Sequence, residues 1–225
     1  MDRLNPSIKD ANWLELRELA KGLGAAVKKH LKGKNLSCLD VGCGKKPYMP
    51  LFEKNCAEFI GLDTDKESLA DKTGTAEKIP FPDNSFDVVL CTQALQYVGS
   101  PKKAVAEIRR VLKKGGLLFL AAPSNYPEFD PPKPKWRFME NGLRILLAGF
   151  EVKEITCVGG PFLAWFQMIN LWLNRKFMRK GSPKPVKLLF WWIVFPANNL
   201  LGFALSRVFG KQGYSLDLLA VAEKK

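Results

Sequence analysis

The sequence has few of the side chains from which metal centres and disulfide frameworks are built. It contains one histidine, His30, and five cysteines, none of which forms a CxxC pair. A lone histidine and an odd number of cysteines argue against a zinc site or a disulfide framework. We therefore expect no bound metal and reduced thiols, as is usual in a reducing compartment.

The N-terminal residues MDRLNPSIKD also lack the apolar run of a secretory signal peptide, which favours a cytoplasmic protein. Acidic residues are scarce, because 22 Asp and Glu stand against 35 Lys and Arg and leave a formal net charge of +13. Such a charge favours anionic partners, which include nucleic acid, an acidic membrane face and phosphorylated substrates. Net charge alone does not choose among these partners.

Apolar patterning predicts strands that alternate with helices along most of the 225 residues. Spacings of three and four predict helices over 12–31, 101–112 and 138–148, and DKESLA is expected to begin another. KKGG is expected to end the helix over 101–112. Buried strands are predicted within NLSCLDVGCG, AEFIGLD, SFDVVLCT, GLLFLAAPS, FEVKEITCVGG and SLDLLAVAEKK. This alternation indicates a parallel sheet built from right-handed βαβ units.

The segment LDVGCG after the first strand carries the most informative motif. Its glycines allow the backbone to approach a ligand closely. Asp63 ends the second strand about 20 residues later, where a Rossmann-type sheet places an acid that binds both hydroxyls of a ribose. GTAEKIPFPDNSFDVVL then leads into a further strand and suits the edge of an adenine ring. Together these elements predict a nucleotide-type cofactor at the strand ends.

LDVGCG, IGLD, AEKIPFPDNSFDVVLCTQALQYV and AEIRRVLKKGGLLFLAAPS resemble the class I S-adenosylmethionine-dependent methyltransferases of the type 11 group. CGKKPY and KWRFMENGLRILLAGFEV resemble bacterial and archaeal members of that group. The resemblance covers roughly residues 36–160 and implies an α/β, Rossmann-like fold. Its seven-stranded, mostly parallel sheet has the order 3-2-1-4-5-7-6, with helices on both faces and, here, an apolar helical insert before the last strand.

The resemblance implies that S-adenosyl-L-methionine is the cofactor. The first strand and its glycines would hold the methionine end, Asp63 the ribose, the next loop the adenine, and the end of the fourth strand the methionyl side. The cofactor-binding residues implied in this way are Asp40, Gly42, Gly44, Asp63, Ala76, Glu77, Cys91 and Thr92. Two positions depart from the pattern: Thr75 replaces a usual Asp, and LQYV replaces a frequent LEHV.

Methyl transfer from a sulfonium mainly requires a nucleophile held in line and shielded from water. The scarcity of histidine therefore does not argue against this activity. A general base helps when the acceptor is a hydroxyl, and the candidate catalytic residues are Tyr97 and Asp130, with Gln93 in a positioning role. Tyr97 has packing against a helix as its alternative role, and Asp130 lies in the proline-rich segment DPPKPKW.

Residues 161–212 differ in kind from the rest of the chain. PFLAWFQMINLWL and KLLFWWIVFPANNLLGFAL are rich in Trp, Phe and Leu, and NRKFMRKGSPKPVK between them is basic. A bilayer span needs about 20 mostly apolar residues, whereas the first stretch is short and Pro196, Asn198 and Asn199 interrupt the second. We expect a helical hairpin that lies in a membrane interface, with a lid or a dimer interface as alternatives.

The sequence thus predicts three parts: an N-terminal helical segment (1–35), a cofactor-binding domain (36–160 with 213–225) and the apolar insert (161–212). The predicted function is methyl transfer to a small-molecule, lipid or lipid-linked acceptor at a membrane surface. The predicted location is the cytoplasm, with peripheral contact at the inner face of the membrane. A nicotinamide-binding protein and a non-catalytic module are the alternatives, although the third glycine of GxGxxG is missing. A homodimer stays open. Nucleic acid is not expected, because no (D/N)PP(Y/F) motif follows the fourth strand.

Overall fold

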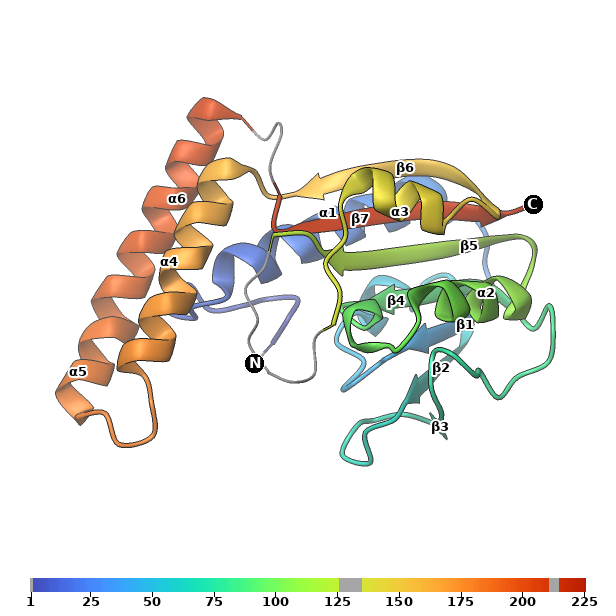
Figure 1. Cartoon of the computed structure of the whole chain (residues 1–225), viewed down its shortest axis with the longest axis horizontal. Helices are drawn as coiled ribbons and strands as arrows, with labels where there is room; N and C mark the ends of the chain where they lie inside the picture. The colour runs from blue at the N-terminus through green and yellow to red at the C-terminus, as the bar shows by residue number, and fades with distance from the viewer. Residues whose placement is uncertain (1, 126–134, 211–214) are drawn as a thin grey trace. The chain divides into compact units, whose positions relative to one another are not determined.

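The computed structural model describes residues 2–125, 135–210 and 215–225 (Figure 1). Its helices are α1 (Trp13–His30), α2 (Pro101–Val111), α3 (Glu140–Leu146), α4 (Pro161–Phe177), α5 (Lys184–Leu189) and α6 (Phe195–Phe209), with 3-10 turns η1 (Met49–Leu51) and η2 (Leu95–Tyr97) and a π-helical segment η3 (Phe190–Val194). Its strands are β1 (Leu36–Val41), β2 (Cys56–Asp63), β3 (Lys72–Thr73), β4 (Phe86–Thr92), β5 (Leu112–Pro123), β6 (Phe150–Val158) and β7 (Asp217–Lys224).

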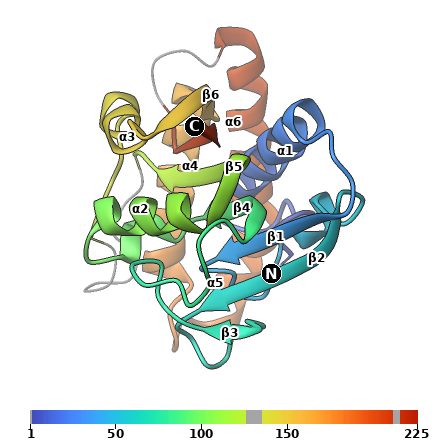
Figure 2. The same ribbon diagram turned by 90° about the vertical axis from the view of Figure 1, so that its right-hand side faces the viewer.

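The seven strands form one sheet in the order β3-β2-β1-β4-β5-β7-β6, which confirms the predicted topology. β1 pairs in parallel with both β2 and β4, and β4 pairs in parallel with β5. β7 runs opposite to β5 (Figure 1), so the sheet is mixed. Figure 2 shows α2 and α3 over one face and α1 over the other. β1 is therefore central, and its carboxyl end lies between those of β2 and β4.

The central strands supply the core of the sheet. Leu39, Val89 and Phe119 are fully buried, as is Ile108 on the inner face of α2. A strand covered on both faces buries nearly every side chain, so it reads as a continuous apolar run and not as an alternation. This is why VVLC and LFLAA predict strands although they lack a two-residue period.

The prediction that KKGG ends α2 was wrong. α2 ends at Val111, and the next residue already belongs to β5, so the two glycines lie within the strand. Gly115 has φ +75° there, and a Cβ on Gly116 would lie 3.1 Å from the carbonyl oxygen of Asp87. The glycines thus permit close backbone approach to β4, which is a second use of glycine that the sequence does not distinguish from a helix cap.

The helix expected to begin at DKESLA is absent. Asp65 instead accepts the backbone N–H of Glu67 through its side chain, and the Ser68 hydroxyl donates to the Asp65 carbonyl. Short polar side chains that bond to nearby backbone groups compete with helix formation. The segment between β2 and β3 is therefore a series of turns.

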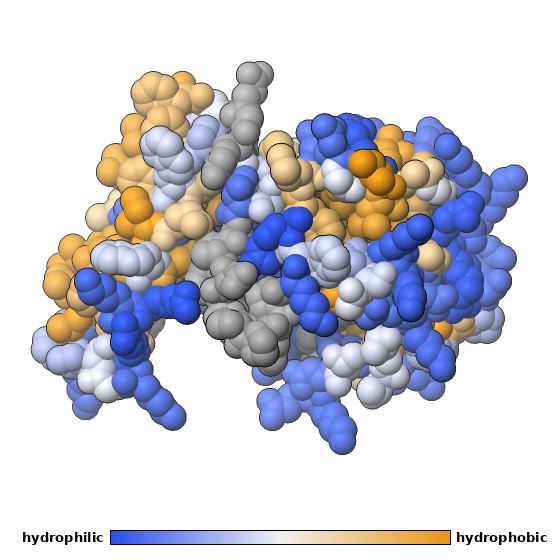
Figure 3. All heavy atoms as spheres, viewed as in Figure 1, coloured by the Kyte–Doolittle hydropathy of each residue, from blue (hydrophilic) through white to orange (hydrophobic). Residues whose placement is uncertain are grey.

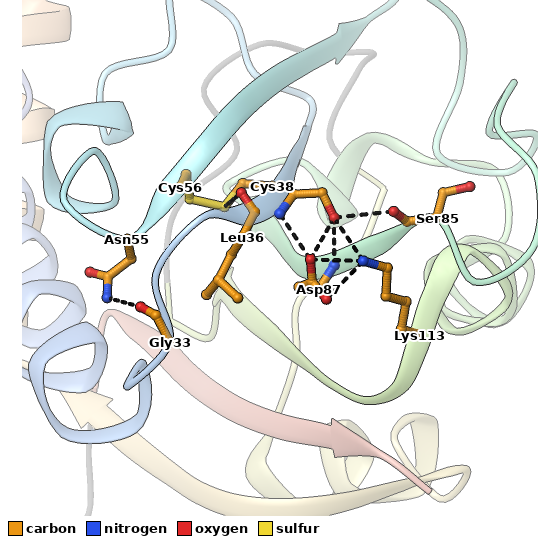
Figure 4. Close-up of a disulfide and its surroundings, with 9 residues drawn as sticks. Gly33, Leu36, Cys38, Asn55, Cys56, Ser85, Asp87 and Lys113 are labelled. Carbon is orange, nitrogen blue, oxygen red and sulfur yellow. Dashed lines mark hydrogen bonds and ion pairs between the residues drawn. A yellow bond between two sulfur atoms is a disulfide. The ribbon is translucent and has the colours of Figure 1, made fainter.

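Cys38 and Cys56 form a disulfide, which corrects the expectation that all thiols are reduced (Figure 4). Their Cα atoms are 6.1 Å apart, within the usual range for a disulfide. The two residues are 18 positions apart in sequence, and the parallel register of β1 and β2 brings them together. Cys43, Cys91 and Cys157 are free thiols. Within the described ranges no cluster of three or more His, Cys, Asp or Glu is suited to a metal ion.

The chain divides into two compact units. Among the described residues, the sheet unit contains Gly22–Ser124, 135–156 and Leu218–Lys225, and the hairpin unit joins the residues up to Lys21 with Cys157–Asp217. In the hairpin unit, Gln167 donates to the Ala11 carbonyl, and Asn199 donates to the carbonyls of Ile8 and Asp10. These bonds attach the N-terminal segment to the apolar helices, a pairing that side-chain periodicity does not reveal.

Candidate functional site

The carboxyl ends of β1 and β2 lie side by side and are joined through backbone groups. The N–H groups of Gly42 and Cys43 both donate to the Leu62 carbonyl, at 2.8 and 3.2 Å. The N–H of Gly44 donates to Oδ2 of Asp63 at 2.8 Å. The glycine turn and the acid that ends β2 are thus in direct contact, as the motif spacing predicts.

The two glycines of this turn have different constraints. Gly42 has φ +74°, and a Cβ placed on it would lie only 2.3 Å from the Cβ of Ala94. Gly44 also has a positive φ, +51°, but no described atom lies within 4 Å of its Cβ position. Gly42 is therefore required by packing against the segment after β4, whereas Gly44 borders open space in which backbone is available to a ligand.

Asp40 lies one residue before the end of β1 and is almost fully buried. Its Oδ1 has no hydrogen-bond partner among the described residues. Burial raises the pKa of Asp40 from 3.8 to about 7; Lys46 lowers this pKa and the nearby Asp63 raises it further. A buried carboxyl with an unsatisfied oxygen, in a position that leads into an open glycine turn, is suited to binding a cation.

Lys46 and Asp71 also belong to this site, although neither residue is among those that the sequence predicts to bind the cofactor. Lys46 has φ +50° and forms an ion pair with Asp71, which also accepts the N–H of Gly61. Burial opposes ionisation of Asp71, but these two contacts outweigh it and hold its pKa below the usual value. Gly61 is the residue in the sequence that accompanies this ion pair. A Cβ at that position would lie 2.5 Å from Cε of Lys46, so the lysine side chain needs a glycine there.

The loop that contains Ala76 and Glu77 is attached at both ends. Gly74 donates its N–H to the Asp63 carbonyl at 3.0 Å, which places the start of the loop beside the tip of β2. The Glu77 carboxylate accepts the N–H groups of Gly99 and Ser100, at 3.0 and 2.8 Å, just before α2. The side chain of Glu77 thus binds the segment before α2, so the part of this loop that is available to border a ligand is its backbone.

The end of β4 contributes residues from the other side of β1. Cys91 and Thr92 are buried, and burial, with a smaller effect of Asp40, raises the pKa of the Cys91 thiol to about 12. Cys91 therefore remains a neutral thiol at physiological pH. Gln93 follows with φ +52°, a strained conformation for a residue other than glycine.

The side-chain amides of Gln93 and the buried Gln96 contact each other here. Nε2 of Gln96 donates to the carbonyl and to Oε1 of Gln93, whereas Nε2 of Gln93 and Oε1 of Gln96 lack partners among the described residues. Of the predicted catalytic residues, Tyr97 lies in η2 with its side chain 43% exposed. Asp130 lies outside the described residues.

Comparison with known proteins agrees with this geometry. Residues 39–120 match the family model described as a methyltransferase domain. An uncharacterized methyltransferase of Bacillus subtilis, YcgJ, is 34% identical over 41% of this chain and 42% of its own length. The human thiol S-methyltransferase TMT1B is 34% identical over 55% of this chain and 46% of its own. Each match thus spans less than half of the relative.

Residues 39–120 thus correspond to a methyltransferase domain of the class I S-adenosylmethionine-dependent type. The fold of a solved structure agrees with this assignment. The putative sarcosine dimethylglycine methyltransferase of Galdieria sulphuraria has a TM-score of 0.62 at 16% identity, with 94% of this chain and 88% of that chain covered. The family match covers the strands that carry both the glycine turn and Asp63.

S-adenosyl-L-methionine is the cofactor of such domains, and the residues present fit it. Its sulfonium and ammonium groups are cationic, which suits the unsatisfied carboxyl oxygen of Asp40 in an otherwise basic protein. Its ribose hydroxyls suit the Asp63 carboxylate, and the open space at Gly44 leaves room for it. The methyltransferase domain therefore provides a carboxylate and open backbone together at the tips of β1 and β2.

Proposed function

We propose that this protein transfers a methyl group from S-adenosyl-L-methionine to a small-molecule, lipid or lipid-linked acceptor at a membrane surface. The observation that carries the proposal is the contact between the Gly44 N–H and the Asp63 carboxylate beside the buried Asp40. S-adenosyl-L-methionine held there would supply a methyl group on a positively charged sulfur, and loss of that methyl group would give a neutral thioether.

Each part of the site has a defined task in this proposal. Asp63 binds the ribose hydroxyls, and its bonds to the N–H groups of Gly44 and Asp65 hold its carboxylate in position. Asp40 faces the cationic end of the cofactor. The turn at Gly42 and Gly44 allows the methionine end to lie against the backbone. Ala76 and Glu77, through their loop backbone, border the adenine, and Cys91 with Thr92 lines the methionyl side.

The acceptor would enter beside the segment after β4. The unsatisfied Nε2 of Gln93 is a hydrogen-bond donor suited to orienting an acceptor oxygen. In-line transfer depends mainly on this orientation and on exclusion of water. Tyr97 or Asp130 would take up the proton if the acceptor is a hydroxyl. A membrane-held acceptor is supported by the apolar hairpin unit, and the basic excess suits the anionic inner face of a membrane.

The proposal is tested by calorimetry followed by a transfer assay. The purified chain is expected to bind S-adenosylhomocysteine and not NAD. Incubation with tritiated-methyl S-adenosylmethionine and total cell extract should then label a product that partitions into chloroform. Label that stays wholly in the aqueous phase would exclude a lipid acceptor. Binding of NAD in place of S-adenosylhomocysteine would overturn the methyltransferase assignment.

Asp40→Asn is expected to weaken cofactor binding while stabilising the free protein above pH 7. The pKa of Asp40 is about 7 in the folded protein, against 3.8 for a carboxyl exposed to water in the unfolded chain, so the folded protein holds this proton more tightly. Stability from this group is therefore present at low pH and is lost as pH rises from about 4 to about 7. At pH 8 the amide should raise the free energy of unfolding by about 1–4 kcal/mol, as measured by urea denaturation.

The same substitution should remove a pH dependence of binding. The cationic cofactor favours the ionised carboxylate. As the pH is raised towards 7, the affinity of the unmodified chain for the cofactor should therefore increase by up to about tenfold per pH unit, and above pH 7 it should stay constant. Asp40→Asn should show weak binding with no such rise. Glu58→Gln, at an exposed position of β2, removes one charge as the matched control and should leave both profiles unchanged. A pH-independent affinity in the unmodified chain would remove Asp40 from the site.

A further inference from the structure

The hairpin unit has an unusual distribution of polarity, because several amide side chains are buried inside it while many large apolar side chains are exposed. On α4, Trp165, Met168, Ile169 and Trp172 are exposed and follow one another at intervals of three, one and three residues. This spacing places them along a single stripe of the helix. On the same helix Gln167 and Asn170 are completely buried. A helix on the surface of a water-soluble protein normally exposes its polar residues and has no such apolar stripe on its outer face.

The second helix of the hairpin also combines exposed apolar side chains with buried polar ones. α5, η3 and α6 form one continuous helix, Lys184–Phe209. Its exposed apolar residues include Leu189, Ile193, Leu200, Leu201 and Val208. Asn199 and Ser206, in contrast, are buried. Figure 3 shows the resulting apolar surface over α4 and α6.

Hydrogen bonds inside the unit satisfy the buried amides. Nδ2 of Asn170 donates to Oδ1 of Asn199 at 2.6 Å, and Nδ2 of Asn198 donates to Oδ1 of Asn170 at 2.8 Å. Asn198 also donates to the Phe166 carbonyl. A Cβ on Gly202 would lie 2.7 Å from the Cβ of Phe166, so a small residue lets the helices approach. Small residues and amide pairs of this kind join helices whose outer surfaces contact lipid.

Charge identifies the kind of surface that the hairpin would meet. Between Glu154 and Asp217 the sequence contains no acidic residue, and its basic residues are Arg175, Lys176, Arg179, Lys180, Lys184, Lys187, Arg207 and Lys211. Indole rings accompany some cations: Nζ of Lys9 lies 3.0 Å from the ring centroid of Trp192, and Nζ of Lys176 lies 5.0 Å from that of Trp172. Tryptophan beside Lys or Arg is typical of the depth at which lipid headgroups meet acyl chains.

We propose that the exposed apolar face of α4 and of the Lys184–Phe209 helix docks on the interface of an anionic lipid bilayer without crossing it. By length and composition alone, Lys184–Phe209 is long and apolar enough to span. The apolar part of α4, residues 161–173, would extend only about 20 Å, which is less than the ~30 Å of hydrocarbon. A crossing would also carry the basic residues between the two helices through the bilayer, at high cost.

This docking surface would provide the membrane contact of the proposed function, and its biological role rests on that function. Lipid binding itself does not require catalysis, so the two are tested separately. The purified chain is mixed with vesicles of phosphatidylcholine alone or with added phosphatidylglycerol, and binding is measured by flotation. Binding should be strong only with the anionic vesicles and should weaken at high salt.

Variants locate the surface. Ile193→Gln, Leu200→Gln and Leu201→Gln together should lower partitioning roughly tenfold or more, because three exposed apolar side chains lose their burial in lipid. The control is Ile145→Gln on α3, which replaces an even more exposed apolar side chain, in the sheet unit, and should float as before. Circular dichroism should report unchanged helix content in both variants. Equal loss in both, or no flotation of the unmodified chain, would overturn the proposal.

Two further outcomes separate the alternatives. Trypsin added outside the vesicles should cleave within 178–187 if the hairpin does not cross, and protection of this segment until detergent is added would indicate a crossing and contradict the proposal. A dimer by light scattering, with no flotation, would assign the apolar face to a second copy of the chain instead. Methyl transfer without vesicle binding would overturn the docking surface alone, and vesicle binding without S-adenosylhomocysteine binding would overturn the proposed function alone.

Discussion

Gly42→Ala is expected to lower the free energy of unfolding by about 2–5 kcal/mol, the sum of overpacking and of a left-handed backbone in a residue with a side chain. The new Cβ would lie 2.3 Å from the Cβ of Ala94, and φ at this position is +74°. Because the two Cβ atoms cannot be this close, either the glycine turn or the segment after β4 must shift. Urea denaturation measures the loss, and calorimetry with S-adenosylhomocysteine should detect no binding.

Two other glycines make this prediction specific. Gly115→Ala, at φ +75° with no atom within 4 Å of the new Cβ, should lose only about 1–2 kcal/mol and bind the cofactor normally. Gly44→Ala has a similar backbone and equally open space, so it should be as stable as Gly115→Ala yet bind the cofactor poorly. Equal cofactor affinities in these two variants would place the ligand away from Gly44.

A second substitution checks the cause of the destabilisation. Ala94→Gly in the Gly42→Ala background removes the atom that the new Cβ meets. The double variant should therefore recover the overpacking part of the loss and approach the stability of Gly115→Ala. If Ala94→Gly restores nothing, the contact between the turn and the segment after β4 is not the source of the effect.

Asp63→Ala should weaken cofactor binding by about 1–3 kcal/mol, or about 5- to 150-fold, because a charge-assisted hydrogen bond to the ligand is lost. Part of the loss comes from the protein itself. Oδ2 of Asp63 accepts the Gly44 N–H, and Oδ1 accepts that of Asp65. Without these acceptors the glycine turn loses its attachment to β2. Calorimetry with S-adenosylhomocysteine measures the change.

The companion variants separate these two contributions. Asp63→Asn keeps an acceptor for the turn but no charge, so its affinity should lie between those of the unmodified chain and Asp63→Ala. Asp65→Asn removes a neighbouring exposed charge and should bind normally. Unchanged affinity of Asp63→Ala, with an intact fold by circular dichroism, would remove Asp63 from the site.

Much of the sheet unit was predictable because its signals are local. The runs VVLC and LFLAA are apolar because both faces of their strands are covered. The glycine turn and Asp63 follow strands that are neighbours in the sheet, so their spacing already places them together. The KKGG prediction was wrong because a pair of glycines in a strand cannot be told from a pair that caps a helix by the local sequence alone. The DKESLA prediction was wrong because an Asp that forms a turn and an Asp that begins a helix stand in similar local sequences.

The non-local part of the site was not predictable in the same way. Lys46 and Asp71 are 25 residues apart, and their ion pair depends on the missing side chain of Gly61. Glu77 was expected at the adenine, whereas its carboxylate binds amides more than 20 residues away, at Gly99 and Ser100. Both contacts arise only when separate segments fold to the same end of the sheet.

The sequence by itself determined the alternation of strands and helices and the acid that faces the glycine turn, because these are written in apolar periodicity and in short spacing along the chain. The order of the strands and the methyltransferase family followed from the resemblance of its motifs to that family. Only the tertiary structure decided which polar residues of the apolar segment are buried, that Cys38 bonds to Cys56, and that Asp40 is desolvated enough to hold a proton near neutral pH. The reason is physical: burial and pairing depend on what surrounds a side chain in space, and residues distant in the sequence provide those surroundings.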